Sequence, residues 1–161
     1  MKKYEHWCDK QHQEKNHKFI VGDLSERLYN ELESYLLHDI NKDLSVAFED
    51  ELQGRISKNY VIHRMNTILD IAEQIELNVK DANSIYGLYD IDWEERRRKW
   101  LISRGLCYQM IAQLKHISTI TLKGTNLDKY VRLSNNADVI ANKIKNVMIA
   151  DDKKRKKGLS L

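Results

Sequence analysis

The chain has 161 residues, of which 42% are hydrophobic and 32% charged, with six glycines and no proline. This composition excludes a disordered polar chain and a proline-rich linker, and it allows one substantial hydrophobic core. The sequence has no apolar run of 18 residues, a polar N-terminus and only Cys8 and Cys107 as cysteines. We therefore expect a cytoplasmic protein with no disulfide framework, no signal peptide and no membrane partner.

The net charge of +3 conceals a strong segregation of charge along the chain. Residues 1–92 carry 11 Lys/Arg and 18 Asp/Glu, a net of −7, whereas residues 93–161 carry 16 Lys/Arg and 6 Asp/Glu, a net of +10. Such segregation predicts association. Either one side of the molecule attracts a polyanion, or the acidic half of one chain meets the basic half of another.

The first half of the chain predicts two helices after a polar N-terminal extension, residues 1–22. The first helix is expected from Leu24 to about Ile40, with Asp23 or Ser25 as its N-cap. Residues 41–43 are a short polar connection, and the second helix is expected from about Leu44 to Val79, with a bend near Gly54. The apolar seams of the two helices are Leu24, Leu28, Leu32, Tyr35/Leu36 and Ile40, and then Leu44, Phe48, Leu52, Ile56, Val61/Ile62, Met65, Ile68/Leu69, Ala72, Ile75 and Val79.

The second half predicts two further helices. Residues 80–92 lose the helical period and are expected to form a loop, and the third helix should begin near Trp93 with Asp92 as its cap. The sequence TLKGTN (121–126) marks a turn, and Thr125 or Asn126 should cap a fourth helix that ends near residue 150. The seams are Trp93, Trp100, Cys107, Met110/Ile111, Leu114 and Ile117, and then Leu127, Tyr130/Val131, Ser134, Ala137, Ile140/Ala141, Ile144 and Val147/Met148. Residues 151–161 are expected to form a disordered basic tail.

These elements predict an all-α fold, an antiparallel up-down-up-down four-helix bundle spanning residues 23–150. Short connections on either side of the middle loop make consecutive helices antiparallel neighbours. The third helix carries a second apolar strip formed by Leu101, Gly105, Tyr108 and Ala112. A monomer's surface helix needs only one apolar stripe, so the second strip favours a homo-oligomer.

Three groups of residues invite a chemical interpretation at first sight. The N-terminal His6, Cys8, His12 and His17 are metal-ligand types, but their spacing matches no closed zinc pattern, so we expect a polar extension and neither a metal nor a cofactor. The sequence also lacks a glycine-rich phosphate loop, an HExxH motif and a GxSxG motif. We therefore expect a binding or assembly protein rather than an enzyme.

A basic cluster at the start of the third helix contains Arg96, Arg97, Arg98, Lys99 and Arg104. Arg97, Trp100, Arg104 and Tyr108 share one broad stripe of a helix, and guanidinium groups alternating with aromatic rings suit phosphate contact and base stacking. The alternative is a solvated face that forms ion pairs with acids of the first two helices.

The tail carries Lys153, Lys154, Arg155, Lys156 and Lys157 in series. These cations predict affinity for nucleic acid through counterion release, with a favourable position at a helix C-terminus as the alternative. A membrane-surface role is disfavoured because no strongly amphipathic apolar segment adjoins the tail in the sequence.

The stretch from about Leu28 to Arg155 carries a series of recognisable motifs. They are LYNELESYLL (28–37), FEDELQGRI (48–56), WEERRRKWLISRGLCYQMIAQL (93–114), KYVRL (129–133) and IANKIK (140–145), followed by the basic tail. In these motifs the chain resembles a small bacterial four-helix-bundle family. That family includes the accessory variability determinant, Avd, of diversity-generating retroelements, and proteins encoded in intervening sequences of ribosomal RNA genes. The chain departs from the family by about two dozen extra N-terminal residues and by lacking a proline between the first two helices.

The resemblance implies a ring-shaped homopentamer that binds a reverse transcriptase and nucleic acid. Such a protein would be a non-catalytic accessory that binds template RNA or cDNA and supports mutagenic retrohoming. The implied nucleic-acid-binding residues are Arg96, Arg97, Arg98, Arg104, Lys123, Lys129, Arg132, Lys143, Lys145, Lys153, Lys154, Arg155, Lys156 and Lys157. A structural or protein-interaction bundle with no nucleic-acid role is the alternative.

Overall fold

The computed structural model describes residues 20–42, 58–119 and 128–159, and within these ranges the chain is helical apart from one short loop. The helices are α2 (Ile20–Lys42), α4 (Lys58–Ser84), α5 (Asp90–Thr119) and α6 (Asp128–Leu159). No strand occurs in the described ranges, and the predicted all-α class is confirmed as a helical bundle. The N-terminal extension before residue 20, the bend near Gly54 and the turn at 121–126 lie outside the described residues.

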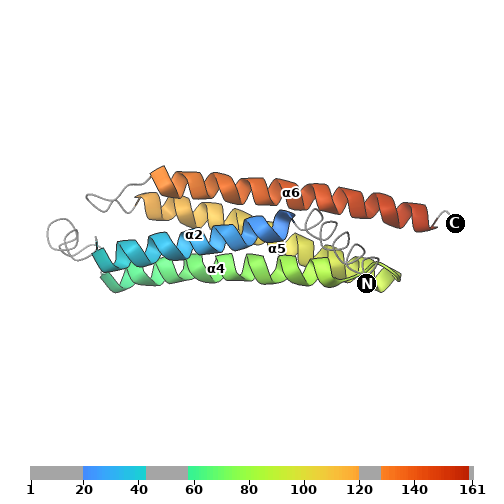
Figure 1. The fold of residues 1–161 in the computed structure, drawn as a ribbon, viewed down its shortest axis with the longest axis horizontal. Helices are drawn as coiled ribbons and strands as arrows, with labels where there is room; N and C mark the ends of the chain where they lie inside the picture. The colour runs from blue at the N-terminus through green and yellow to red at the C-terminus, as the bar shows by residue number, and fades with distance from the viewer. Residues whose placement is uncertain (1–19, 43–57, 120–127, 160–161) are drawn as a thin grey trace, which may run out of the picture.

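The four helices form an elongated rod (Figure 1). The colour gradient shows α2 and α5 running toward the left end of the view, and α4 and α6 running toward the right end. In the chain's packing α4 lies beside α5, α5 beside α6, and α2 beside both α4 and α6. Helix α2 covers only part of the rod's length, so toward the right end the described helices are α4, α5 and α6.

The core consists of the apolar seams that the period predicts. Buried side chains are Leu28, Leu32 and Leu36 of α2, Met65, Ile68, Ala72, Ile75 and Val79 of α4, Trp100, Cys107, Met110, Leu114 and Ile117 of α5, and Tyr130, Ala137, Ile140, Ala141, Ile144 and Met148 of α6. The buried faces differ from the predicted seams at several positions, since Val131 is 55% exposed and Trp93 is only half-buried. Leu133 is buried in α6 while Ser134 is only half-buried, and Ser103 joins the buried face of α5, where its hydroxyl donates to the Lys99 carbonyl at 2.9 Å.

The N-cap predicted for the first helix is wrong, because α2 begins at Ile20, ahead of Asp23 and Ser25. Ser25 is buried inside the helix, and its hydroxyl donates to the Gly22 carbonyl at 2.8 Å. The residues before Leu24 continue the apolar face, with Val21 buried. A hydroxyl that bonds backward to its own helix stabilises no free N–H group, so Ser25 does not act as a cap.

The loop predicted for residues 80–92 is shorter than expected, because α4 continues through Ser84 and α5 begins at Asp90. The carbonyl of Tyr89 accepts the amide hydrogens of Asp92 at 3.0 Å and Trp93 at 3.2 Å, which makes Tyr89 the N-cap. The Asp92 carboxylate accepts the Tyr89 amide hydrogen at 3.0 Å. Asp92 therefore closes the helix start from the third helical position, as the acid of a capping box does, rather than as the cap itself.

The disordered tail predicted for residues 151–161 is also wrong over most of its length, because α6 continues to Leu159. The reason is that Asp151 and Asp152 precede the lysine run and form ion pairs with α5. Arg155, in the middle of the run, contacts Asp90 at the start of α5 at 3.2 Å. These ion pairs hold the last turns of α6 against the first turns of α5. The lysines therefore belong to a helix that contacts with α5 stabilise.

Candidate nucleic-acid interface

The first arginine of the cluster on α5 is not at the surface. The Arg96 side chain is 15% exposed and forms a bidentate ion pair with Asp151 of α6, with nitrogen–oxygen distances of 2.6 and 3.2 Å. Its Nη1 also donates to the carbonyl of Ala82 in the last turn of α4 at 2.9 Å, and to the carbonyl of Ile85 just after that helix at 3.2 Å. The guanidinium lies 5.6 Å from the Trp100 ring centroid. Arg96 of α5 thus links α4 and α6, and its guanidinium donates its hydrogen bonds to groups inside the bundle.

The next two arginines are exposed but paired. Nη1 of Arg97 lies 2.8 and 2.9 Å from the two carboxylate oxygens of Asp152. Arg98 bonds Glu95 of its own helix at 2.7 Å, and this hydrogen bond is the main reason why the pKa of Glu95 is lowered. The acids that meet these arginines come from α6 and from α5 itself, whereas ion pairs to the first two helices were the expected alternative. Among the acids that the structure describes in α2 and α4, one pairs with this cluster, namely Asp81 of α4, which lies 3.6 Å from Lys99.

The two aromatic rings of the predicted stripe differ in burial, so the stripe is not one continuous surface. Trp100 is buried in the core, so its ring offers no face for a base to stack on. Farther along α5, Arg104 donates to the Tyr108 hydroxyl at 3.1 Å and lies 5.5 Å from that ring's centroid. Tyr108 is exposed, and Leu101, Gly105 and Ala112 of the second apolar strip are exposed with it.

Two predicted cations lie near the start of α6 and meet α2. Lys129 lies 5.5 Å from the ring centroid of Tyr35, and Arg132 donates to the Tyr35 hydroxyl. Arg132 also lies 3.9 Å from a carboxylate oxygen of Glu31. Both cations of α6 therefore contact side chains of α2 at the interface between the two helices. Lys123, the remaining residue of the predicted set in this region, is outside the described residues.

The remaining cations lie on the outward side of α6. Lys145, Lys153, Lys154 and Lys156 are exposed and Lys143 is half-buried, and none of the five forms an ion pair with a residue that the structure describes. Lys157 is exposed as well. Arg155 differs, because it is turned toward α5 and reaches Asp90 and Glu94 at 3.2 and 3.8 Å. Lys143, Lys145, Lys153, Lys154 and Lys156 are therefore predicted cations that no described acid neutralises.

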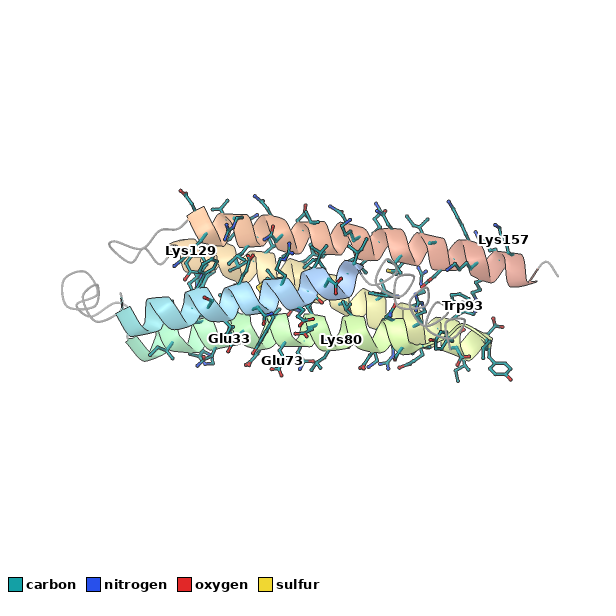
Figure 2. All side chains as sticks on the ribbon, in the orientation of Figure 1. Glu33, Glu73, Lys80, Trp93, Lys129 and Lys157 are labelled. Carbon is teal, nitrogen blue, oxygen red and sulfur yellow. The ribbon has the colours of Figure 1, made fainter. Side chains whose placement is uncertain are left out.

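The helices divide the charge of the bundle into two sides. Helix α6 contains nine Lys/Arg and four Asp/Glu and α5 six and four, whereas α2 contains two and five and α4 three and four. Figure 2 shows Glu33 and Glu73 on the side of α2 and α4, and Lys129 and Lys157 along α6. The pKa of Tyr29 is raised mainly by the charge of Glu33, then by burial and by further acids of α4 including Glu73.

The acids that organise this surface were missed by the sequence reasoning. Asp151, Asp152 and Asp90 hold the ends of α5 and α6 together, yet the first two were assigned to a disordered tail. One signal was available, since an Asp-Asp pair directly before a lysine run suits pairing with a neighbouring arginine run. Within the described ranges no cluster of His, Cys, Asp and Glu could hold a metal ion, and residues 1–19 with their histidines are not among them.

No family model matches the chain, and neither does any curated protein or solved structure. Among the described helices, none is both long enough and apolar enough to cross a membrane.

Proposed function

We propose that this protein is a non-catalytic bundle that binds nucleic acid through the outward lysines of α6. The observation that carries the proposal is the contrast between the two basic regions. Arg96, Arg97 and Arg98 of α5 are paired with acids of the same chain, whereas Lys143, Lys145, Lys153, Lys154 and Lys156 of α6 form no ion pair with a residue that the structure describes. A row of cations on a rigid helix suits a phosphate backbone, because each phosphate bound releases counterions without first ordering a flexible tail.

The resemblance to Avd supports a more specific role. In this proposal the bundle has the antiparallel up-down-up-down arrangement and assembles into a cytoplasmic ring, five-fold by resemblance. The ring binds a reverse transcriptase together with its template RNA or cDNA and supports mutagenic retrohoming. The exposed strip containing Leu101, Tyr108 and Ala112 is the surface offered for assembly. Sedimentation that finds only a 19.1 kDa monomer at micromolar concentration and all salt concentrations would contradict the ring.

A salt titration of binding tests the nucleic-acid role. We expect Lys153→Ala/Lys154→Ala/Lys156→Ala to weaken binding of a labelled RNA or DNA and to reduce the slope of log K against log salt by roughly 0.7 to 0.9 for each phosphate that is no longer neutralised. The matched pair Lys154→Ala and Lys80→Ala removes one exposed lysine from α6 or from α4. Only the change on α6 should matter, because Lys80 lies on the acidic side and pairs with Glu76 at 2.6 Å. Equal effects of the two changes would contradict the assignment to α6.

A structural or protein-interaction bundle is the second candidate. The pairing of Arg96, Arg97 and Arg98 with acids of the same chain favours it, since these arginines stabilise the helices whether or not a ligand is bound. Under this alternative, the wild-type chain would bind neither RNA nor DNA at low salt, and a reverse transcriptase encoded beside it would not co-purify with it.

A further inference from the structure

The loop between α4 and α5 and the first turn of α5 present four large apolar side chains at one end of the rod (Figure 1). Tyr86, Leu88, Tyr89 and Ile91 are 73, 80, 72 and 72% exposed, and we call these four residues the apolar tip. Every other exposed large hydrophobic residue in the described ranges is at most 55% exposed. A cluster of this kind marks an interaction site more often than isolated exposed apolar residues do.

The backbone that carries the apolar tip is fixed by its surroundings. A Cβ atom on Gly87 would lie 2.1 Å from Cε2 of Trp93, so the glycine backbone packs directly against the indole ring. The Tyr89 amide donates to Asp92, the Leu88 amide donates to the Tyr86 carbonyl at 3.0 Å, and Arg96 holds the Ile85 carbonyl. A loop held at this many points presents its side chains without a large ordering cost on binding.

The apolar tip adjoins the basic end of α6. Arg155 bonds Asp90, which lies between Tyr89 and Ile91 in the chain, and also contacts Glu94. These ion pairs offset the negative charge at the start of α5, and Figure 2 places Trp93 and Lys157 at the same end of the rod. From Lys157 back to Lys143 the helix covers about 21 Å at 1.5 Å per residue, so the lysines extend away from the tip along the rod in two groups, residues 153–157 and residues 143–145.

We propose that the apolar tip stacks unpaired nucleobases of a single strand whose phosphates follow the lysines of α6, an inference that rests on the proposed function. Exposed aromatic rings beside a basic track are the combination that single-strand binders use, and each stacked base adds to the affinity whatever its sequence. In a duplex the bases stack on one another, so only a single strand or an open end gains this affinity. A linear polyanion reaches both the row of lysines and the tip, whereas a flat bilayer touching the tip would reach only the last lysines.

The test compares a 12-nucleotide single-stranded RNA with a duplex of equal phosphate number whose two ends are closed by linkers that carry no bases, by fluorescence anisotropy with the full chain. The test variant is Tyr86→Ala/Tyr89→Ala, and the matched control is Tyr86→Phe/Tyr89→Phe, which keeps both rings. We expect the wild-type chain to prefer the single strand. The alanine pair should weaken single-strand binding at least about tenfold, with duplex binding and its salt slope unchanged, and the phenylalanine pair should behave as wild type. Both tyrosines are largely exposed, so circular dichroism should report an unchanged fold.

The outcomes separate this inference from the proposed function. If the lysine variants lose binding while the alanine pair binds the single strand as tightly as wild type, the tip assignment fails and the function of α6 stands. If the wild-type chain binds neither nucleic acid, both fail. If the Tyr86→Ala/Tyr89→Ala chain forms an oligomer of a different size from the wild type, the tip belongs to a subunit interface. Loss of binding to phosphatidylserine vesicles in that variant, with RNA binding intact, would assign the tip to a membrane. Either result overturns the proposal.

Discussion

The ion pair between Arg96 and Asp151 gives the most direct measurement of what holds the two basic helices together. The perturbation is Arg96→Ala. It removes both hydrogen bonds to Asp151 and the donors to the Ala82 and Ile85 carbonyls. It also leaves the Asp151 carboxylate, 12% exposed, without its cation.

The expected loss of stability follows from that burial. Removing one member of a buried ion pair costs about 3 kcal/mol or more, because the remaining charge stays desolvated. Arg97→Ala is the matched control on the neighbouring residue, and the 48 and 50% exposure of Arg97 and Asp152 limits its cost to about 0.5 kcal/mol. Against a total stability of about 5–15 kcal/mol, only the first change should be conspicuous.

Urea unfolding followed by circular dichroism checks the difference. With a slope of about 2 kcal/mol per molar urea, Arg96→Ala should lower the midpoint by roughly 1.5 M and Arg97→Ala by less than about 0.5 M. The double change Arg96→Leu/Asp151→Leu should recover much of the stability, because no unpaired charge then remains buried. Equal midpoints for Arg96→Ala and Arg97→Ala would refute the argument from burial.

The remaining predictions concern the loop after α4 and the single described cysteine. Gly87→Ala should lower the free energy of unfolding in urea by about 1–3 kcal/mol, because its Cβ would overlap the Trp93 ring. Gly105→Ala should stabilise by about 0.5–1 kcal/mol, because, apart from its chain neighbours and the backbone of its own helix, no atom lies within 4 Å of the new Cβ. A destabilising Gly105→Ala would contradict this comparison. Burial raises the pKa of Cys107 to about 12, so in a Cys8→Ser chain at pH 8 an aromatic disulfide reagent should react at least about a hundredfold more slowly than in urea. Between about pH 9 and 12 the folded thiol keeps its proton where the unfolded thiol loses it, so the free energy of unfolding falls as the pH rises through this range. The Cys107→Ser chain lacks this titration, so the difference between its urea midpoint and that of the wild type should change with pH. A difference that stays constant across the range would contradict the prediction.

The helices themselves could be predicted because each seam repeats at helical spacing. Leu28, Leu32 and Leu36 lie four residues apart and are all buried, and Trp100, Cys107 and Leu114 recur every seven residues with the same result. A repeated apolar residue reports burial irrespective of which helix it packs against. The period therefore identified the core faces without knowledge of the neighbours.

The ends of the helices and the fate of the arginines depend on neighbours and could not be predicted in this way. Arg96 is buried because the register of α5 against α6 brings Asp151 opposite it, 55 residues along the chain. In the sequence alone, Arg96 is one of a run of cations, and such a run predicts a solvated or phosphate-binding face. The lysines after Asp152 suggest repulsion and disorder in the same way when they are read in the sequence alone. In the structure they are helical, because the acids that precede them form ion pairs with α5.

The separation of acidic α2 and α4 from basic α5 and α6 gives the rod an electric dipole moment across its width. A particle with such a moment experiences a torque in the field of a polyanion as soon as the two come within about a Debye length, some 8 Å at physiological salt. The rod therefore turns its α6 side forward before any atoms touch. Added salt shortens the range of this alignment, so it slows productive encounters more than it speeds dissociation.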